Sequence, residues 1–468
     1  MKLFSYASAQ PPVSNIATEE VHDVSSDMET LSIQVDGYLS VGRVCDSVAA
    51  ESMTFVDKKN ITLYNEYVNL LATRMGVEAP KSVSTESFET EGQLAANYSI
   101  SLEGWMKDMW EKIKAVFVKI YESVKAFFTK YFTRLGRLKK SLQNLQDAIG
   151  STNKDIGDPS MENPPSALLN AFAGHSEVNN STISVSIANI GVLVSKLGAV
   201  NKAAEGFSSS GLVSADFVKN IQDLKDKAVK ASGDSEANRA KHDKLKTFGD
   251  RDKKKELDTE NKDLEEIQRE AQSQATDDTN TLISTGEELD AGDDKANQEA
   301  AQKEFDDFMK IVIETFDQVK GKVLVNGQKV LKVESKPDEG LVLEMSSEAD
   351  PANDLRLSGK AALAELISSC KALIKTAEND VKNYGNVNDK IMDSFKTIDR
   401  LTGDIDKIDP EKFGKYKKVI NERIRVRLGL LKNFFTTYNK LSKNVLEMSM
   451  DVSEQTVNYA VLSLKHFK

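Results

Sequence analysis

The segment 105–149 limits the possible folds of this chain more than any other feature. Its apolar residues recur about every 3.67 residues, the 11-residue period that keeps one face of a nearly straight helix aligned. The repeat is visible in three consecutive stretches, WMKDMWEKIKA, VFVKIYESVKA and FFTKYFTRLGR. We therefore predict one long amphipathic helix. Its apolar stripe consists of Trp105, Met109, Ile113, Val116, Ile120, Val124, Phe127, Tyr131, Leu135, Leu138, Leu142, Leu145 and Ile149.

This helix has three possible uses. Its broad apolar face could pack into a core while the lysine side chains reach outward. It could instead lie in a lipid headgroup layer, or its lysines could meet nucleic-acid phosphates. The candidate lipid- or partner-contact residues are Trp105, Trp110, Phe117, Tyr121, Phe127, Phe128, Tyr131 and Phe132. The candidate basic face consists of Lys107, Lys112, Lys114, Lys119, Lys125 and Lys130.

The rest of the chain is also predicted to be mainly α-helical. Only 9 prolines and 25 glycines interrupt the 468 residues, and apolar residues recur at helical spacing between them. We expect one or more multi-helix bundles with a small antiparallel β-hairpin or three-stranded sheet near 322–345, where Asn326-Gly327 suits a tight turn. Asp409-Pro410 is typical of a helix start, and a long helix should run from there to about Met450. A short helix capped by Ser453 should follow.

Charge is distributed unevenly along the chain. The first 103 residues carry most of the net charge of −11, whereas the basic helix and the stretch 411–450 are positive. We expect Arg423, Arg425 and Arg427 in that stretch to lie on a solvated face. The predicted organisation is an acidic region 1–103, a helical domain 104–231, a charged linker 232–300 and a second helical domain 301–468 with the hairpin.

Motifs for enzyme chemistry are missing from the sequence. No common phosphate-binding, zinc, acyl-transfer or calcium motif occurs, and the four histidines lie in separate segments. Cys45 and Cys370 lie far apart, and no run of 18 apolar residues suggests a membrane span. We predict a non-enzymatic protein without catalytic residues, metal, cofactor or small-molecule substrate, with an enzyme of unrecognised fold as the more distant alternative.

Ser101-Leu102-Glu103, followed by Gly104, directly precedes the basic helix. This tripeptide resembles the site at which head-maturation proteases of large contractile-tailed bacteriophages cut after glutamate. Three other segments also fit the pattern: Ser84-Thr85-Glu86, Ser87-Phe88-Glu89 and Ser346-Ser347-Glu348. An acidic leader, this tripeptide and a lysine-rich helical body together resemble an internal head protein of those phages, processed by the protease.

The resemblance implies a structural virion protein made in the host cytoplasm and enclosed in the capsid. Its partners would be the head-maturation protease and other proteins of the capsid interior, and the acidic leader would be a propeptide removed after Glu103. Ejection with the DNA, and contact of the protein with DNA or membrane, are left open. The alternative function is a membrane-active helical protein that uses the 105–149 helix.

Overall fold

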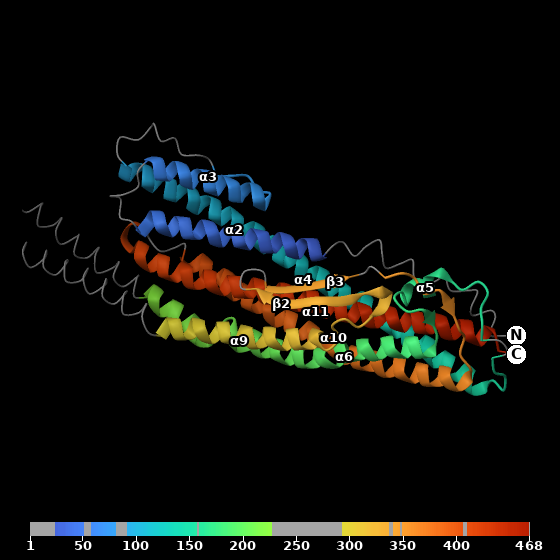
Figure 1. The fold of residues 1–468 in the computed structure, drawn as a ribbon. Helices are drawn as coiled ribbons and strands as arrows, with labels where there is room; N and C mark the ends of the chain where they lie inside the picture. The colour runs from blue at the N-terminus through green and yellow to red at the C-terminus, as the bar shows by residue number, and fades with distance from the viewer. Residues whose placement is uncertain are drawn as a thin grey trace, which may run out of the picture.

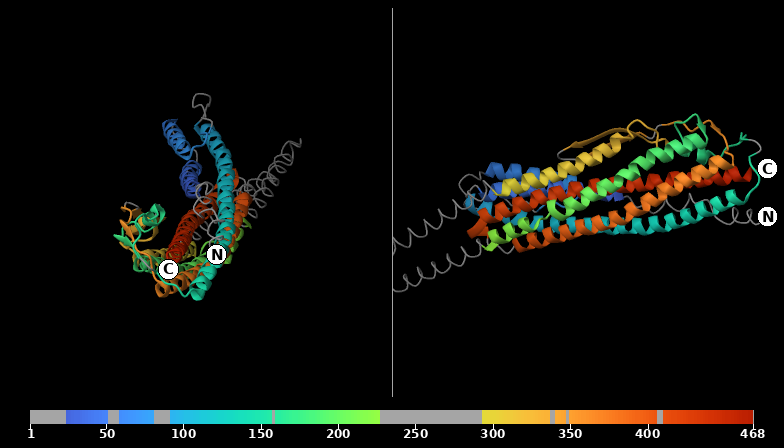
Figure 2. Two further views of the ribbon diagram at one scale, coloured as in Figure 1. Left: turned by 90° about the vertical axis from the view of Figure 1, so that its right-hand side faces the viewer. Right: turned by 90° about the horizontal axis from the view of Figure 1, so that it is seen from below.

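The computed structural model describes residues 24–50, 58–80, 91–156, 159–226, 293–336, 340–346, 349–405 and 410–467. Over these residues the chain forms an elongated bundle whose long helices share one axis (Figure 1). Figure 2 shows the same alignment from below. The predicted mainly α fold is confirmed. The long helices are α2 (Val24–Ala50), α3 (Lys58–Met75), α4 (Glu91–Ser151), α6 (Asn180–Gly206), α9 (Asp293–Asp317), α10 (Lys360–Ile405) and α11 (Pro410–Lys465).

Helix α11 is the helix around which much of the bundle packs. It contacts α2, α4, α6 and α10, and the side chains of Leu431, Phe434, Phe435 and Tyr438 are fully buried among them. The helix begins at Pro410 and continues to Lys465, so the predicted end near Met450 is wrong. Ser453 caps no second helix, because its hydroxyl donates back to the Ser449 carbonyl within α11.

Helix α4 confirms the apolar stripe predicted from the 11-residue period. Every member of the stripe is buried except Val116 and Phe127, which are half-buried. The stripe lies against α2, α10 and α11. The helix is longer than predicted, because it starts at Glu91 and runs without a break through Glu103 and Gly104.

Helices α6 and α10 pack against each other and against α11. The side chain of Asn179 caps α6 by accepting a hydrogen bond from the Thr182 backbone N–H at 3.0 Å. Among the described helices, α6 alone is long and apolar enough to cross a membrane by length and composition. The same properties suit a core helix, and α6 packs against α9, α10 and α11.

The predicted β-hairpin is present, but its arms are shifted along the chain. Strand β2 (Lys329–Lys336) pairs antiparallel with β3 (Gly340–Ser346). Asn326 and Gly327 do form a left-handed turn, with φ of 58° and 69°. That turn lies in the short 3-10 helix η3 (Val325–Gly327), before the hairpin.

Short elements close one end of the bundle. Helix α5 (Ser166–Ala171) precedes strand β1 (Glu177–Val178), which pairs in parallel with β4 (Asp354–Leu355). At the other end of α6, away from α5, the one-turn π-helix η2 (Phe207–Gly211) extends the helix, and a further helical stretch covers 215–226.

The acidic N-terminal region contributes helices to the same bundle. Helix α2 packs along α4 and α11, and α3 packs mainly on α2. The buried side of α2 consists of Met28, Leu31, Val35, Tyr38, Val41 and Val44. Most of the predicted charged linker, 227–292, lies outside the described residues, and so do the tripeptides ending at Glu86 and Glu89.

Candidate functional site

The predicted processing segment lies inside α4. Leu102 is completely buried, Ser101 and Glu103 are half-buried, and Gly104 is exposed. The Lys417 Nζ of α11 lies 3.1 Å from Glu103 Oε2, so an ion pair ties this turn to the neighbouring helix. Because a protease binds its substrate as extended chain, cutting here requires this turn of α4 to open first.

The residues around the segment hold it in place. The Trp105 indole donates a hydrogen bond to the Glu78 carbonyl at 2.8 Å, which links α4 to the end of the α3 region. The Trp110 indole donates to Asp399 Oδ1 at 2.7 Å, and its ring lies 5.6 Å from that of Tyr38. Both tryptophans predicted as lipid or partner contacts are therefore buried in contacts within the chain.

The other aromatic residues divide between core and surface. Phe117 is stacked between Phe395 and Phe435, with ring centroids 4.0 and 4.4 Å away. The Tyr131 hydroxyl lies 3.1 Å from Ser449 Oγ, and Phe128 meets Tyr384 edge-on at 4.6 Å. Tyr121 and Phe127 are half-buried, and Phe132 is exposed. The aromatic face thus mainly fills the core, the first of the three uses considered.

The predicted basic face remains at the surface, and several of its lysines pair with acids. Lys119 Nζ lies 2.8 Å from Asp27 Oδ1 of α2, and Lys114 bridges Glu111 and Asp399 at 2.6 and 3.2 Å. Lys125 lies over the Tyr121 ring, 4.3 Å from its centroid. Lys107, Lys112 and Lys130 are exposed.

Cationic side chains of the positive stretch 411–450 lie inside the bundle, on α11. Arg423, Arg425 and Arg427 are buried, which corrects the expectation of a solvated face. Arg427 Nη1 donates to the Gly211 carbonyl at 2.6 Å, and its guanidinium lies 4.9 Å from the Phe217 ring. The aromatic and carbonyl partners lie far away in the sequence, so no local signal could have revealed them.

Helix α2 covers part of this cationic stretch of α11. Lys432 of α11 is only 3 % exposed, and its Nζ lies 2.6 Å from Asp36 Oδ1. Arg425 lies so close to Gly42 that a methyl group there would collide with the guanidinium. An acidic helix from the N-terminal region therefore shields cationic side chains of α11.

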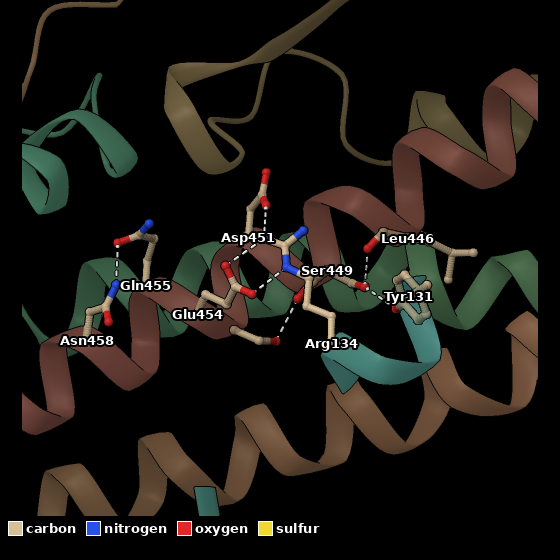
Figure 3. Close-up of polar contacts among 9 residues, drawn as sticks. Tyr131, Arg134, Leu446, Ser449, Asp451, Glu454, Gln455 and Asn458 are labelled. Atoms are coloured by element: carbon tan, nitrogen blue, oxygen red, sulfur yellow. Dashed lines mark hydrogen bonds and ion pairs between the residues drawn. The ribbon is translucent and has the colours of Figure 1, made fainter. Parts of the chain in front are cut away.

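A charged cluster joins α4 to α11 (Figure 3). Arg134 of α4 holds Glu454 through two hydrogen bonds, one of them 2.6 Å from Nη2 to Oε2. The same nitrogen lies 3.2 Å from Asp451 Oδ1. Burial raises the pKa values of Asp451 and of nearby Glu447.

Asp380 of α10 is a buried carboxyl that faces Gly198 of α6. Its Oδ2 has no hydrogen-bond partner among the described residues. Burial raises the pKa of this carboxyl to about 7. Between about pH 4 and pH 7 the folded state then holds a proton that the unfolded state has lost, so this group makes stability fall as pH rises.

We expect Asp380→Asn to stabilise the protein at pH 8 by on the order of 2 kcal/mol, because the variant buries no charge. Thermal melts between pH 5 and pH 8 measure this. The gain should shrink toward pH 5, where the wild-type carboxyl is neutral. Asp393→Asn, on the same helix but exposed, is the matched control. A gain that does not vary with pH would contradict the role assigned to ionisation.

Comparison with known proteins identifies the family. A family model described as phiKZ-like phage internal head proteins matches residues 17–460, nearly the whole chain. The chain belongs to this family. No curated protein and no solved structure matches it.

The family assignment confirms the resemblance to internal head proteins of large phages. An internal head protein is assembled in the host cytoplasm and lies inside the virion head, as expected. The match extends through both helical regions, so the bundle described above is the fold of an internal head protein.

Proposed function

We propose that this internal head protein is a non-catalytic structural component whose acidic leader is removed after Glu103 by a head-maturation protease. Two observations support the proposal. The tripeptide lies at the junction of the acidic region and the basic helix. Helix α2 of the acidic region shields Lys432 on the body through Asp36, and this contact carries the argument.

The shielding suggests what removal of the leader achieves. Departure of α2 would uncover Lys432 and Arg425 on α11 and leave Lys119 on α4 without Asp27. These cations would then be available to anionic partners inside the head, including other capsid-interior proteins. The leader thus keeps the precursor from making these contacts too early.

Removal proceeds in two steps. The buried position of Leu102 means that the turn around Glu103 must open before the protease can cut. After the cut, α2 is still held by its buried apolar side chains, each contributing about 1.5–3 kcal/mol. Departure of the leader is therefore a separate event from cleavage. DNA contact, membrane contact and ejection with the genome stay predictions.

Mass spectrometry of the protein from mature virions tests the cleavage. We expect an N-terminus at Gly104 in the wild type and an uncut chain in Glu103→Gln, because the protease reads the glutamate side chain. Glu86→Gln and Glu89→Gln, which alter the competing tripeptides, serve as controls and should be cut normally. A mature chain that retains residues before Gly104 would remove the basis of the proposal.

A further inference from the structure

Helix α3 presents an apolar face that no described part of the chain covers. Leu63, Tyr67 and Leu70 are 54, 43 and 67 % exposed. At about 100° per residue they lie on one side of the helix, whereas Val68 and Ala72 on the other side are fully buried. Large apolar side chains grouped on one exposed helix face are typical of an interaction surface.

The position of α3 leaves this face open. The helix lies at the edge of the bundle, beyond α2 and α4 (Figure 1). It ends at Met75, where Gly76 with φ of 65° turns the chain back. Among the described residues, none lies on the outer side of α3, where a neighbouring molecule could approach.

The residues of this face are arranged so that it could pair with the same face of a second copy. The spacing from Leu63 through Tyr67 and Leu70 to Arg74 is four, three and four residues, the seam of a two-helix coiled coil. Glu66 and Arg74 lie four residues before and after Leu70, on the same side of the helix. The charges are thus arranged symmetrically, with opposite sign, about Leu70.

This arrangement selects one orientation for a second copy. Antiparallel pairing about Leu70 brings Arg74 of each copy level with Glu66 and Tyr67 of the other, so opposite charges meet at both ends. Parallel pairing would bring Glu66 level with Glu66 and Arg74 level with Arg74, and like charges would repel. A contact with identical patches on both copies is the usual form of a two-fold interface.

We propose that the exposed face of α3, centred on Leu70 and flanked by Glu66 and Arg74, binds the same face of a second copy in antiparallel orientation. One 18-residue helix offers less area than a stable dimer interface needs. The association is therefore weak and depends on concentration. The inference concerns the intact chain and does not rest on the proposed cleavage.

Sedimentation equilibrium of the full chain over a wide concentration range tests the proposal. The wild type should shift from monomer to dimer as concentration rises, and Leu70→Glu should stay monomeric. Because Leu70 is exposed, that variant should melt like the wild type, which separates loss of association from loss of folding. A wild type that remains monomeric, or a Leu70→Glu variant that still dimerises, would overturn the proposal.

Charge reversal sharpens the test. Glu66→Arg and Arg74→Glu should each weaken dimerisation, because each leaves like charges facing one another. The double variant Glu66→Arg/Arg74→Glu restores both pairs and should dimerise as the wild type does. An equimolar mixture of the two single variants should also associate. If the double variant is as weak as the singles, Glu66 and Arg74 do not pair across the contact, and the antiparallel arrangement about Leu70 is overturned.

Discussion

Phe117→Ala should destabilise the protein by about 3–5 kcal/mol, the loss expected when a fully packed aromatic ring is removed from a core. Phe117 is 2 % exposed and stacked between Phe395 of α10 and Phe435 of α11. Its loss leaves a cavity where three helices meet. Urea denaturation followed by circular dichroism measures the change.

Phe132→Ala is the matched control, on the same helix and of the same residue type. Phe132 is 38 % exposed, so its truncation should change the free energy of unfolding by about 1 kcal/mol or less. Equal losses of unfolding free energy at the two positions would mean that Phe117 contributes no more to the core than the exposed Phe132 does. The lipid-contact use of the helix would then regain support.

Arg134→Met should destabilise the protein by about 3–5 kcal/mol, because it leaves partly buried carboxylates without their cation. Glu454 is almost fully buried and accepts two hydrogen bonds from the guanidinium. Since burial already raises the pKa of Asp451, the loss should be smaller at acidic pH, where the Asp451 carboxyl accepts a proton. Denaturation at pH 5 and pH 8 measures both effects.

The double variant Arg134→Met/Glu454→Leu distinguishes the loss of the ion-pair attraction from the cost of leaving the buried Glu454 carboxylate unpaired. Replacing both partners with apolar groups should recover much of the stability, because no buried carboxylate at 454 remains unpaired. Arg137→Met, an exposed position three residues on, should lie within about 0.5 kcal/mol of the wild type. A double variant as unstable as Arg134→Met would show that the pair itself holds α4 to α11.

The long helices were predictable because their signal is local and repeated. The stripe from Trp105 to Ile149 follows from spacing alone, and its burial in α4 agrees with that pattern. Helix ends were less predictable. Ser453 resembles a cap in sequence, but in α11 its hydroxyl bonds to Ser449 and the surrounding core keeps the helix continuous.

The buried cations could not be predicted, because their partners are distant in sequence. Arg427 meets Gly211 and Phe217, and Lys432 meets Asp36, contacts that arise only when the helices assemble. The predicted processing tripeptide, Ser101-Leu102-Glu103, also shows what sequence alone does not reveal. Its sequence matches the protease pattern, but only the fold reveals that Leu102 is buried within a continuous helix.

The length of the central helices has a consequence for packing inside the head. At about 1.5 Å per residue, α4 and α11 extend about 92 and 84 Å, so the molecule is a stiff rod rather than a sphere. Crowded rods exclude less volume from one another when they lie parallel, so confinement by itself favours aligned neighbours. For the described helices, a rod-like shape would therefore favour parallel neighbours wherever copies are crowded, before any specific contact forms.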